Sequence, residues 1–73
     1  MKTVEIFKTN VISKRAAKAL LDEIDSQQLG YKCNFDLEDR DKVLRIENTS
    51  GKIDTGLIIE ILSAKNFSCE ILE

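Results

Sequence analysis

Apolar and polar residues alternate along residues 3–9, which predicts a β-strand near the start of the chain. The alternation leaves two faces that could be buried. We expect the buried face to carry Phe7, Thr9 and Val11. This choice follows because Val11 must cover the start of the element that comes next. Val4 and Ile6 then lie on the opposite face of the sheet, where they would add to a small apolar patch if exposed.

The next stretch has the pattern of an amphipathic helix. Ser13 is a suitable N-cap, and Gly30 is a typical left-handed stop at the other end. Apolar residues between them fall at i, i+3, i+4 and i+7, namely Ala17, Leu20, Leu21 and Ile24. This spacing makes one helical stripe, and the outer face is charged.

Two strands joined by a polar turn are predicted in the middle of the chain. Apolar residues occupy every second position of the first of them: Tyr31, Cys33, Phe35 and Leu37. Residues 38–41 form the turn, and residues 42–47 return as a strand with Leu44 and Ile46 inward and Val43 outward. Residues 48–51 (NTSG) read as a loop.

A second helix and a last short strand follow. Asp54 or Thr55 is the expected N-cap, and Asn66 could supply the left-handed residue after the helix. Phe67, Cys69 and Ile71 then alternate with polar residues in the closing strand.

The order of elements is therefore β-α-β-β-α-β, within a single domain over residues 1–73. This order predicts an α+β fold, a ferredoxin-like sandwich with a four-stranded antiparallel sheet and both helices on one face. The other face of the sheet is left to solvent or to a partner.

Composition narrows the possible functions. The net charge of −2 argues against a general nucleic-acid binder, which would be basic. The chain has no histidine, which removes histidine-based acid–base catalysis, Ser-His-Asp and Cys-His pairs, and histidine-containing zinc sites. No apolar run suits a membrane span and no signal peptide is visible, so we expect a cytoplasmic protein. Without a visible nucleophile–base pair, we expect neither an enzyme nor a cofactor.

Residues 7–11 (FKTNV) and the helix behind them resemble the start of heavy-metal-associated domains, which include small copper chaperones and modules of copper-transporting ATPases. The resemblance extends to residues 43–47 (VLRIE) and to residues 61–72, and so covers nearly the whole chain in element order. Residues 35–39 and 42–47 look like a small bacterial subgroup of that family.

The family carries a Cys-x-x-Cys pair after its first strand, which binds Cu(I) through two soft thiolates. In this chain the corresponding positions hold Ser13 and Ala16, neither of which is a soft ligand. The resemblance therefore implies a member that keeps the scaffold without the metal site.

The cysteines leave a metal-binding alternative open. Cys33 and Cys69 are the two soft ligands of the chain, and a weakly bound Cu(I) or zinc ion could use either of them, alone or across a dimer. The competing interpretation is that both are small core residues on the apolar phase of their strands, which the topology puts at opposite edges of the sheet.

A basic elbow is the leading candidate site, and comprises Asn10, Ser13, Lys14, Arg15 and Lys18. Lys14 and Arg15 fall in the first turn, where the helix dipole favours acidic residues and positive charge is unfavourable. A sequence that departs from such a preference without an evident gain in stability can mark a functional site. In the metal chaperones that the chain resembles, the corresponding loop and first helix face the partner protein. The alternative is a solvated face on which Lys18 pairs with Asp22. We expect a protein-interaction domain that uses this elbow, with self-association through Val4, Ile6 and Val43 as a further possibility.

Overall fold

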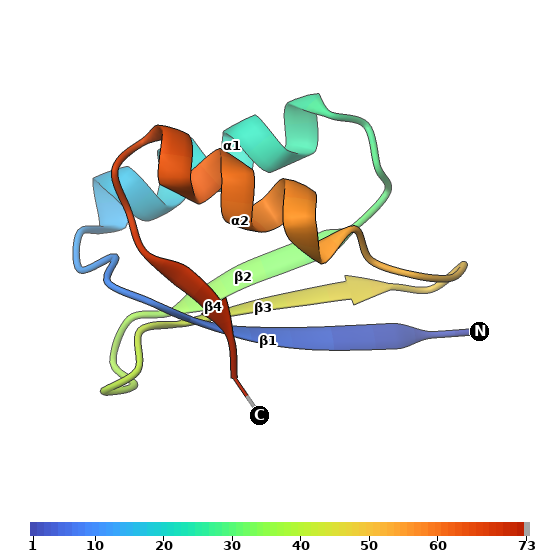
Figure 1. The fold of residues 1–73 in the computed structure, drawn as a ribbon, viewed down its shortest axis with the longest axis horizontal. Coiled ribbons are helices and arrows are strands. Elements are labelled where there is room, and N and C mark those ends of the chain that lie inside the picture. Colours follow the sequence, from blue (N-terminus) through green and yellow to red (C-terminus); the bar gives the residue numbers. More distant parts are fainter. Residues whose placement is uncertain (73) are drawn as a thin grey trace.

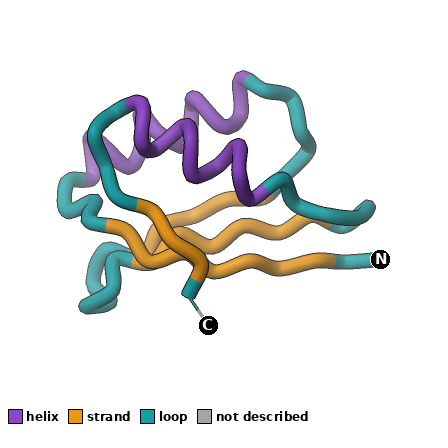
Figure 2. Tube along the Cα trace, in the orientation of Figure 1, coloured by secondary structure: helices purple, strands orange, loops and turns teal. Residues whose placement is uncertain are grey.

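The computed structural model describes residues 1–72, which form two helices and four strands. In chain order these are β1 (Thr3–Thr9), α1 (Lys14–Ser26), β2 (Lys32–Asp36), β3 (Val43–Asn48), α2 (Thr55–Ala64) and β4 (Cys69–Ile71). Both helices lie side by side on one face of the sheet (Figure 1). The layers are easily separated in Figure 2, where the purple helices cover the orange strands from one side only.

The sheet has the order β2-β3-β1-β4, and every pairing is antiparallel. This arrangement confirms the predicted α+β class and is consistent with a ferredoxin-like βαββαβ fold. Strands β1 and β3 are central, and β2 and β4 form the two edges. Phe7 stands opposite Leu44 on β3 and opposite Ile71 on β4, so β1 joins both halves of the sheet.

The core lies between the sheet and the helices. Strand β1 contributes Phe7, with Val11 just beyond it, and both are fully buried. Thr9 is also buried, which confirms the predicted inner face of β1. The other buried apolar residues are Ala17, Leu20, Ile24, Leu44, Ile46, Ile53, Ile58, Ile61 and Leu62.

The predicted N-caps are confirmed, but the predicted end of the first helix is wrong. The Ala16 N–H donates to Ser13 Oγ at 3.2 Å, and the Leu57 N–H donates to Asp54 Oδ1 at 3.1 Å. Helix α1 ends at Ser26 rather than running on to Gly30. Its buried stripe stops at Ile24, so no further burial supports another turn. Gln28 already adopts a left-handed φ of 55°.

The strand boundaries differ from the predicted ones where local geometry intervenes. Lys42 has a left-handed φ of 47°, which delays the start of β3 to Val43. Asn48 belongs to β3 and is buried, although composition placed it in a loop. Its amide Nδ2 donates to the Lys52 carbonyl at 2.8 Å, and its Oδ1 accepts from Ser50. Asn48 thus closes the loop that follows it.

The last strand is shorter and more open than expected. Strand β4 spans three residues, and Ile71 is 42% exposed although it lies on the predicted apolar phase. The reason is its position on an edge strand near the rim of the core, whereas its neighbour Phe7 is central. Asn66 does supply the left-handed residue after α2, with a φ of 67°.

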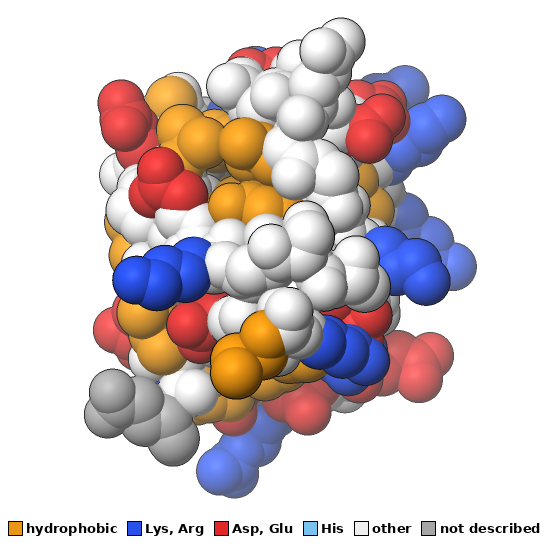
Figure 3. Space-filling model, turned by 90° about the vertical axis from the view of Figure 1, so that its right-hand side faces the viewer, with side chains coloured by type: hydrophobic (Ala, Val, Ile, Leu, Met, Phe, Trp, Pro, Cys, Tyr) orange, Lys and Arg blue, Asp and Glu red, His pale blue; other side chains and the backbone are white. Residues whose placement is uncertain are grey.

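The face of the sheet opposite the helices has no covering layer in the described part of the chain (Figure 1). Val4 is 38% exposed there, and Ile6 is half-buried. Positive and negative side chains are interspersed on the side of the molecule drawn in Figure 3, in keeping with the small net charge. Neither helix of the described chain has the length and apolar character needed to cross a membrane.

Candidate functional site

A groove of about 480 Å³ runs between α1 and the edge strand β2. Its apolar wall combines Ala17 and Leu21 of α1 with Phe35 of β2 and Leu37 just beyond it. Lys14 and Lys18 form the basic part of its rim, and Asn34, Asp36 and Glu38 complete the lining. We call these nine residues the α1–β2 groove.

The groove exists because α1 does not fully cover the edge of the sheet. On α1 itself, the side that faces the core carries the buried residues Ala17, Leu20 and Ile24. Leu21 is only half-buried and lies on the side toward β2. Phe35 packs against the core but lies on an edge strand, with no further strand outside it among residues 1–72. Four residues along a helix make a little more than one turn, so Lys14 and Lys18 line up on the same side. The result is an apolar recess beneath two cations.

Neither lysine of the rim forms an ion pair within residues 1–72. The ion pairs in this part of the chain are Lys2–Glu47 at 3.5 Å, Lys8–Asp41 at 4.0 Å and Arg45–Glu47 at 2.8 Å. None of them involves Lys14 or Lys18, and the alternative pairing of Lys18 with Asp22 does not form. The two ammonium groups are therefore available to an outside carboxylate.

The five residues of the basic elbow have different positions. Lys14 and Lys18 belong to the groove. Asn10 Oδ1 accepts a hydrogen bond from the Ser68 N–H at 2.9 Å, and Ser13 caps α1, so both have intramolecular structural roles. Arg15 is exposed about 100° around the helix from Lys14 and does not line the groove.

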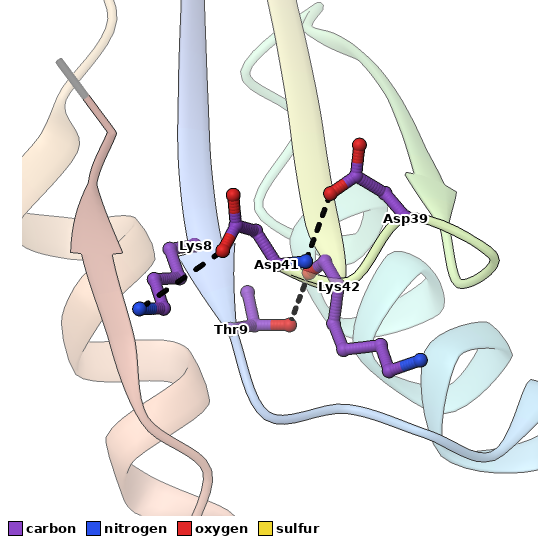
Figure 4. A network of polar contacts seen from close by, with 5 residues as sticks. All are labelled: Lys8, Thr9, Asp39, Asp41 and Lys42. Atoms are coloured by element: carbon purple, nitrogen blue, oxygen red, sulfur yellow. Dashed lines mark hydrogen bonds and ion pairs between the residues drawn. The ribbon is translucent and has the colours of Figure 1, made fainter.

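Thr9 anchors the loop before α1, a role that the sequence pattern alone did not reveal. Its Oγ1 donates to the Lys42 carbonyl at 2.6 Å (Figure 4). The same Oγ1 accepts from the Val11 N–H at 3.2 Å. The Thr9 N–H also donates to the Asp41 carbonyl at 3.1 Å. A hydroxyl on the buried phase of a strand was the available signal, since a buried polar group needs partners.

The acidic turn between β2 and β3 is held by hydrogen bonds from its backbone N–H groups to its own aspartate side chains. Asp36 Oδ1 accepts from the Glu38 N–H at 3.3 Å, and Asp39 Oδ1 accepts from the Asp41 N–H at 2.8 Å. Asp41 also reaches Lys8 across the network drawn in Figure 4. Within residues 1–72, no three acidic or cysteine side chains converge on a common point for a metal ion.

The two cysteines lie far apart and are half-buried. Cys33 is on β2 and Cys69 on β4, opposite edges of the sheet that lie about 14 Å apart at ordinary strand spacing. They are also offset along the strands, because Cys33 is level with Glu5 of β1 and Cys69 with Thr9. Burial raises the pKa of the Cys33 thiol to about 11, with Asp25 adding to the effect. Burial likewise raises the pKa of Cys69 to about 11, with Glu70 adding to it. A soft-metal site would therefore need one thiol alone or thiols from two chains, and the thiols are protonated at neutral pH.

These thiols should make the protein less stable at alkaline pH. In the unfolded chain they ionise near pH 9.0, whereas in the folded protein they stay protonated up to about pH 11. The unfolded state therefore loses protons first, and the free energy of unfolding should fall as the pH rises from about 9 to 11. Urea unfolding at about pH 8 and about pH 11 measures this fall. The variant Cys33→Ala/Cys69→Ala should show a smaller fall, and an equal fall in both proteins would contradict the two shifted pKa values.

No protein-family model, curated protein or solved structure matches the chain. The resemblance to heavy-metal-associated domains stays a prediction.

Proposed function

We propose that this protein is a non-catalytic interaction domain that binds another protein chain in the α1–β2 groove. It would use a scaffold like that of metal chaperones, with Ser13 and Ala16 in place of their thiol pair. The proposal includes a cytoplasmic location, which the two unbridged cysteines favour.

One observation carries the proposal: an apolar recess is lined by charged residues of both signs, Lys14 and Lys18 together with Asp36 and Glu38, and the two lysines have no ion-pair partner in the described chain. Burying apolar side chains in such a recess supplies affinity, and the unpaired lysines can bind and orient a carboxylate of the partner. The groove residues include no serine, threonine or cysteine that a neighbouring base could activate. Binding is therefore the function that this geometry supports best.

Site-specific photo-crosslinking in the cells that make the protein tests the proposal. Glu38 is exposed at the mouth of the groove and can carry the photoreactive residue. Ser63 is exposed on α2 and serves as the control position. We expect a discrete protein adduct from position 38 and none from position 63, because the partner seats on the groove only.

Charge reversal then shows whether the lysines of the rim matter. Lys14→Glu/Lys18→Glu should reduce the position-38 adduct about tenfold or more, the loss expected from about 1.4 kcal/mol of binding energy. The fold should be kept, since an acidic residue at position 14 suits the first turn of α1 and Lys18 is exposed. Lys52→Glu/Lys65→Glu makes the same charge change at two exposed lysines outside the groove and should leave the adduct intact. Equal adducts from both double variants would overturn the proposal.

A further inference from the structure

The two sides of the α1–β2 groove carry opposite charge. Lys14 and Lys18 belong to α1, whereas Asp36 ends β2 and Glu38 lies in the turn that follows it. All four residues are exposed, and none of them forms an ion pair within residues 1–72. Two cations and two anions therefore line one groove from opposite sides without pairing with each other.

Apolar side chains line the space between the charged sides. Ala17 and Leu21 stand four residues apart on α1, and Phe35 and Leu37 stand two residues apart along the end of β2. Four residues of a helix rise about 6 Å and two residues of a strand about 6.6 Å, so the two apolar pairs cover a similar length. All four belong to the core or pack against it, which gives the groove a fixed apolar lining.

The size and lining of the groove suit a small molecule. Its volume is about 480 Å³. Small-molecule sites commonly enclose about 300–1,000 Å³ and combine a mostly apolar lining with a few polar or charged groups. The groove has this composition, with four apolar residues, four charged ones and the amide of Asn34.

The charges decide which class of small molecule the groove complements. An inorganic anion would meet Asp36 and Glu38 as well as the two lysines, and a simple cation would meet the lysines as well as the acids. An uncharged apolar molecule would use the apolar lining and neither charged side. A molecule with a carboxylate, an ammonium group and an apolar side chain complements all three parts.

We propose that the α1–β2 groove binds a small zwitterion of the hydrophobic α-amino acid class. Its carboxylate lies toward Lys14 and Lys18, its ammonium group toward Asp36 and Glu38, and its side chain against Phe35. Both charged groups of an α-amino acid are attached to one carbon atom, so a single molecule in the middle of the groove faces both sides. Such a ligand needs no partner chain, and the inference therefore goes beyond the proposed function and does not depend on it.

NMR titration of the isotope-labelled protein with L-phenylalanine tests the inference. N-acetylphenylalanine keeps the carboxylate and loses the positive charge, and phenylalaninamide keeps the positive charge and loses the carboxylate. We expect L-phenylalanine to bind saturably with a Kd of about 1 mM or tighter, to shift the amide resonances of Leu21 and Phe35, and to bind about tenfold more tightly than either derivative. Glycine has no apolar side chain and should bind at least about tenfold more weakly than L-phenylalanine.

Charge variants assign each group of the ligand to one side of the groove. Lys14→Gln/Lys18→Gln should weaken L-phenylalanine about tenfold or more and should not weaken phenylalaninamide, which has no carboxylate to lose. Asp36→Asn/Glu38→Gln should weaken L-phenylalanine by a similar factor and should not weaken N-acetylphenylalanine. The asparagine keeps an oxygen that can accept the N–H of residue 38, so the turn is preserved.

Lys52→Gln/Lys65→Gln is the matched control, because it removes two exposed lysines outside the groove and should bind L-phenylalanine as the unmodified protein does. Three results would each overturn the inference. These are the absence of saturable binding by L-phenylalanine, equal binding of the amino acid and its two derivatives, and equal losses in the two lysine double variants. Crosslinking from position 38 judges the proposed function separately, since a protein adduct can form whether or not an amino acid binds.

Discussion

Replacing Phe7 by alanine is expected to lower the free energy of unfolding by about 3–5 kcal/mol, the range observed for large aromatic truncations in cores. Phe7 is fully buried on the central strand β1, with Leu44 opposite it on β3. Its removal costs the transfer of the ring from water and leaves a cavity that the surrounding sheet can only partly close. A domain of this length has a total stability on the order of 4–11 kcal/mol, so the variant should lose a large share of it.

Urea unfolding followed by circular dichroism measures the effect. Ile12→Ala is the control, because Ile12 is 78% exposed and its truncation should change the free energy of unfolding by less than about 0.5 kcal/mol. If Phe7→Ala cost no more than Ile12→Ala, the inner face assigned to β1 would be wrong. Should the Phe7 variant not fold at all, Phe7→Leu gives a smaller measurable loss in the same direction.

Replacing Thr9 by valine is expected to cost about 2 kcal/mol or more, although valine has nearly the same shape. The change leaves the Val11 N–H and the Lys42 carbonyl without the hydroxyl that now bonds to both. A buried polar group that loses its partner costs about 1–3 kcal/mol, because water cannot replace the bond. The loop before α1 should also be held less tightly to the turn after β2, because only the bond from the backbone N–H of residue 9 to the Asp41 carbonyl remains of the Thr9 contacts.

Two measurements separate this effect from a packing change. Thr9→Ser keeps the hydroxyl and loses a methyl group. Its free energy of unfolding, measured by urea unfolding, should therefore fall less than that of Thr9→Val. Amide exchange of Val11 should become faster in Thr9→Val, because its N–H loses its acceptor, and should stay slow in Thr9→Ser. Unchanged exchange at Val11 in the valine variant would show that the hydroxyl does not hold this loop.

The Thr9 network also matters for the proposed binding surface. Thr9 ties the end of β1 to the turn after β2, and Asn10 ties the same loop to Ser68 before β4. Helix α1 begins four residues after Asn10, so these bonds fix where Lys14 stands relative to β2. A groove held by fixed elements loses less entropy when it binds a partner.

Much of the fold could be predicted from local chemistry. The inner face of β1 was predicted because Val11 must cover the start of the following helix, and the caps at Ser13 and Asp54 followed from side chains that accept backbone N–H bonds. The end of α1 was predicted at Gly30, beyond its actual end at Ser26. A glycine shows where a left-handed turn forms easily, but the helix ends where its buried stripe ends. Asn48 was assigned to a loop because residues 48–51 have the composition of a turn. In the structure Asn48 is the last residue of β3, and its buried side-chain amide donates to the Lys52 carbonyl and so closes the loop.

The sequence by itself determined the order of elements, the helical and strand periodicities, and the unusual cations Lys14 and Arg15 at a helix start, with Lys18 after them. It could not place Phe35 and Leu37 beside Lys14 and Lys18, because α1 and β2 meet only after β3 and β1 have set the order of the sheet. Whether an apolar side chain is covered or open depends on which strand becomes an edge. Periodicity shows the face that a side chain occupies, and only the tertiary structure decides what lies beside it.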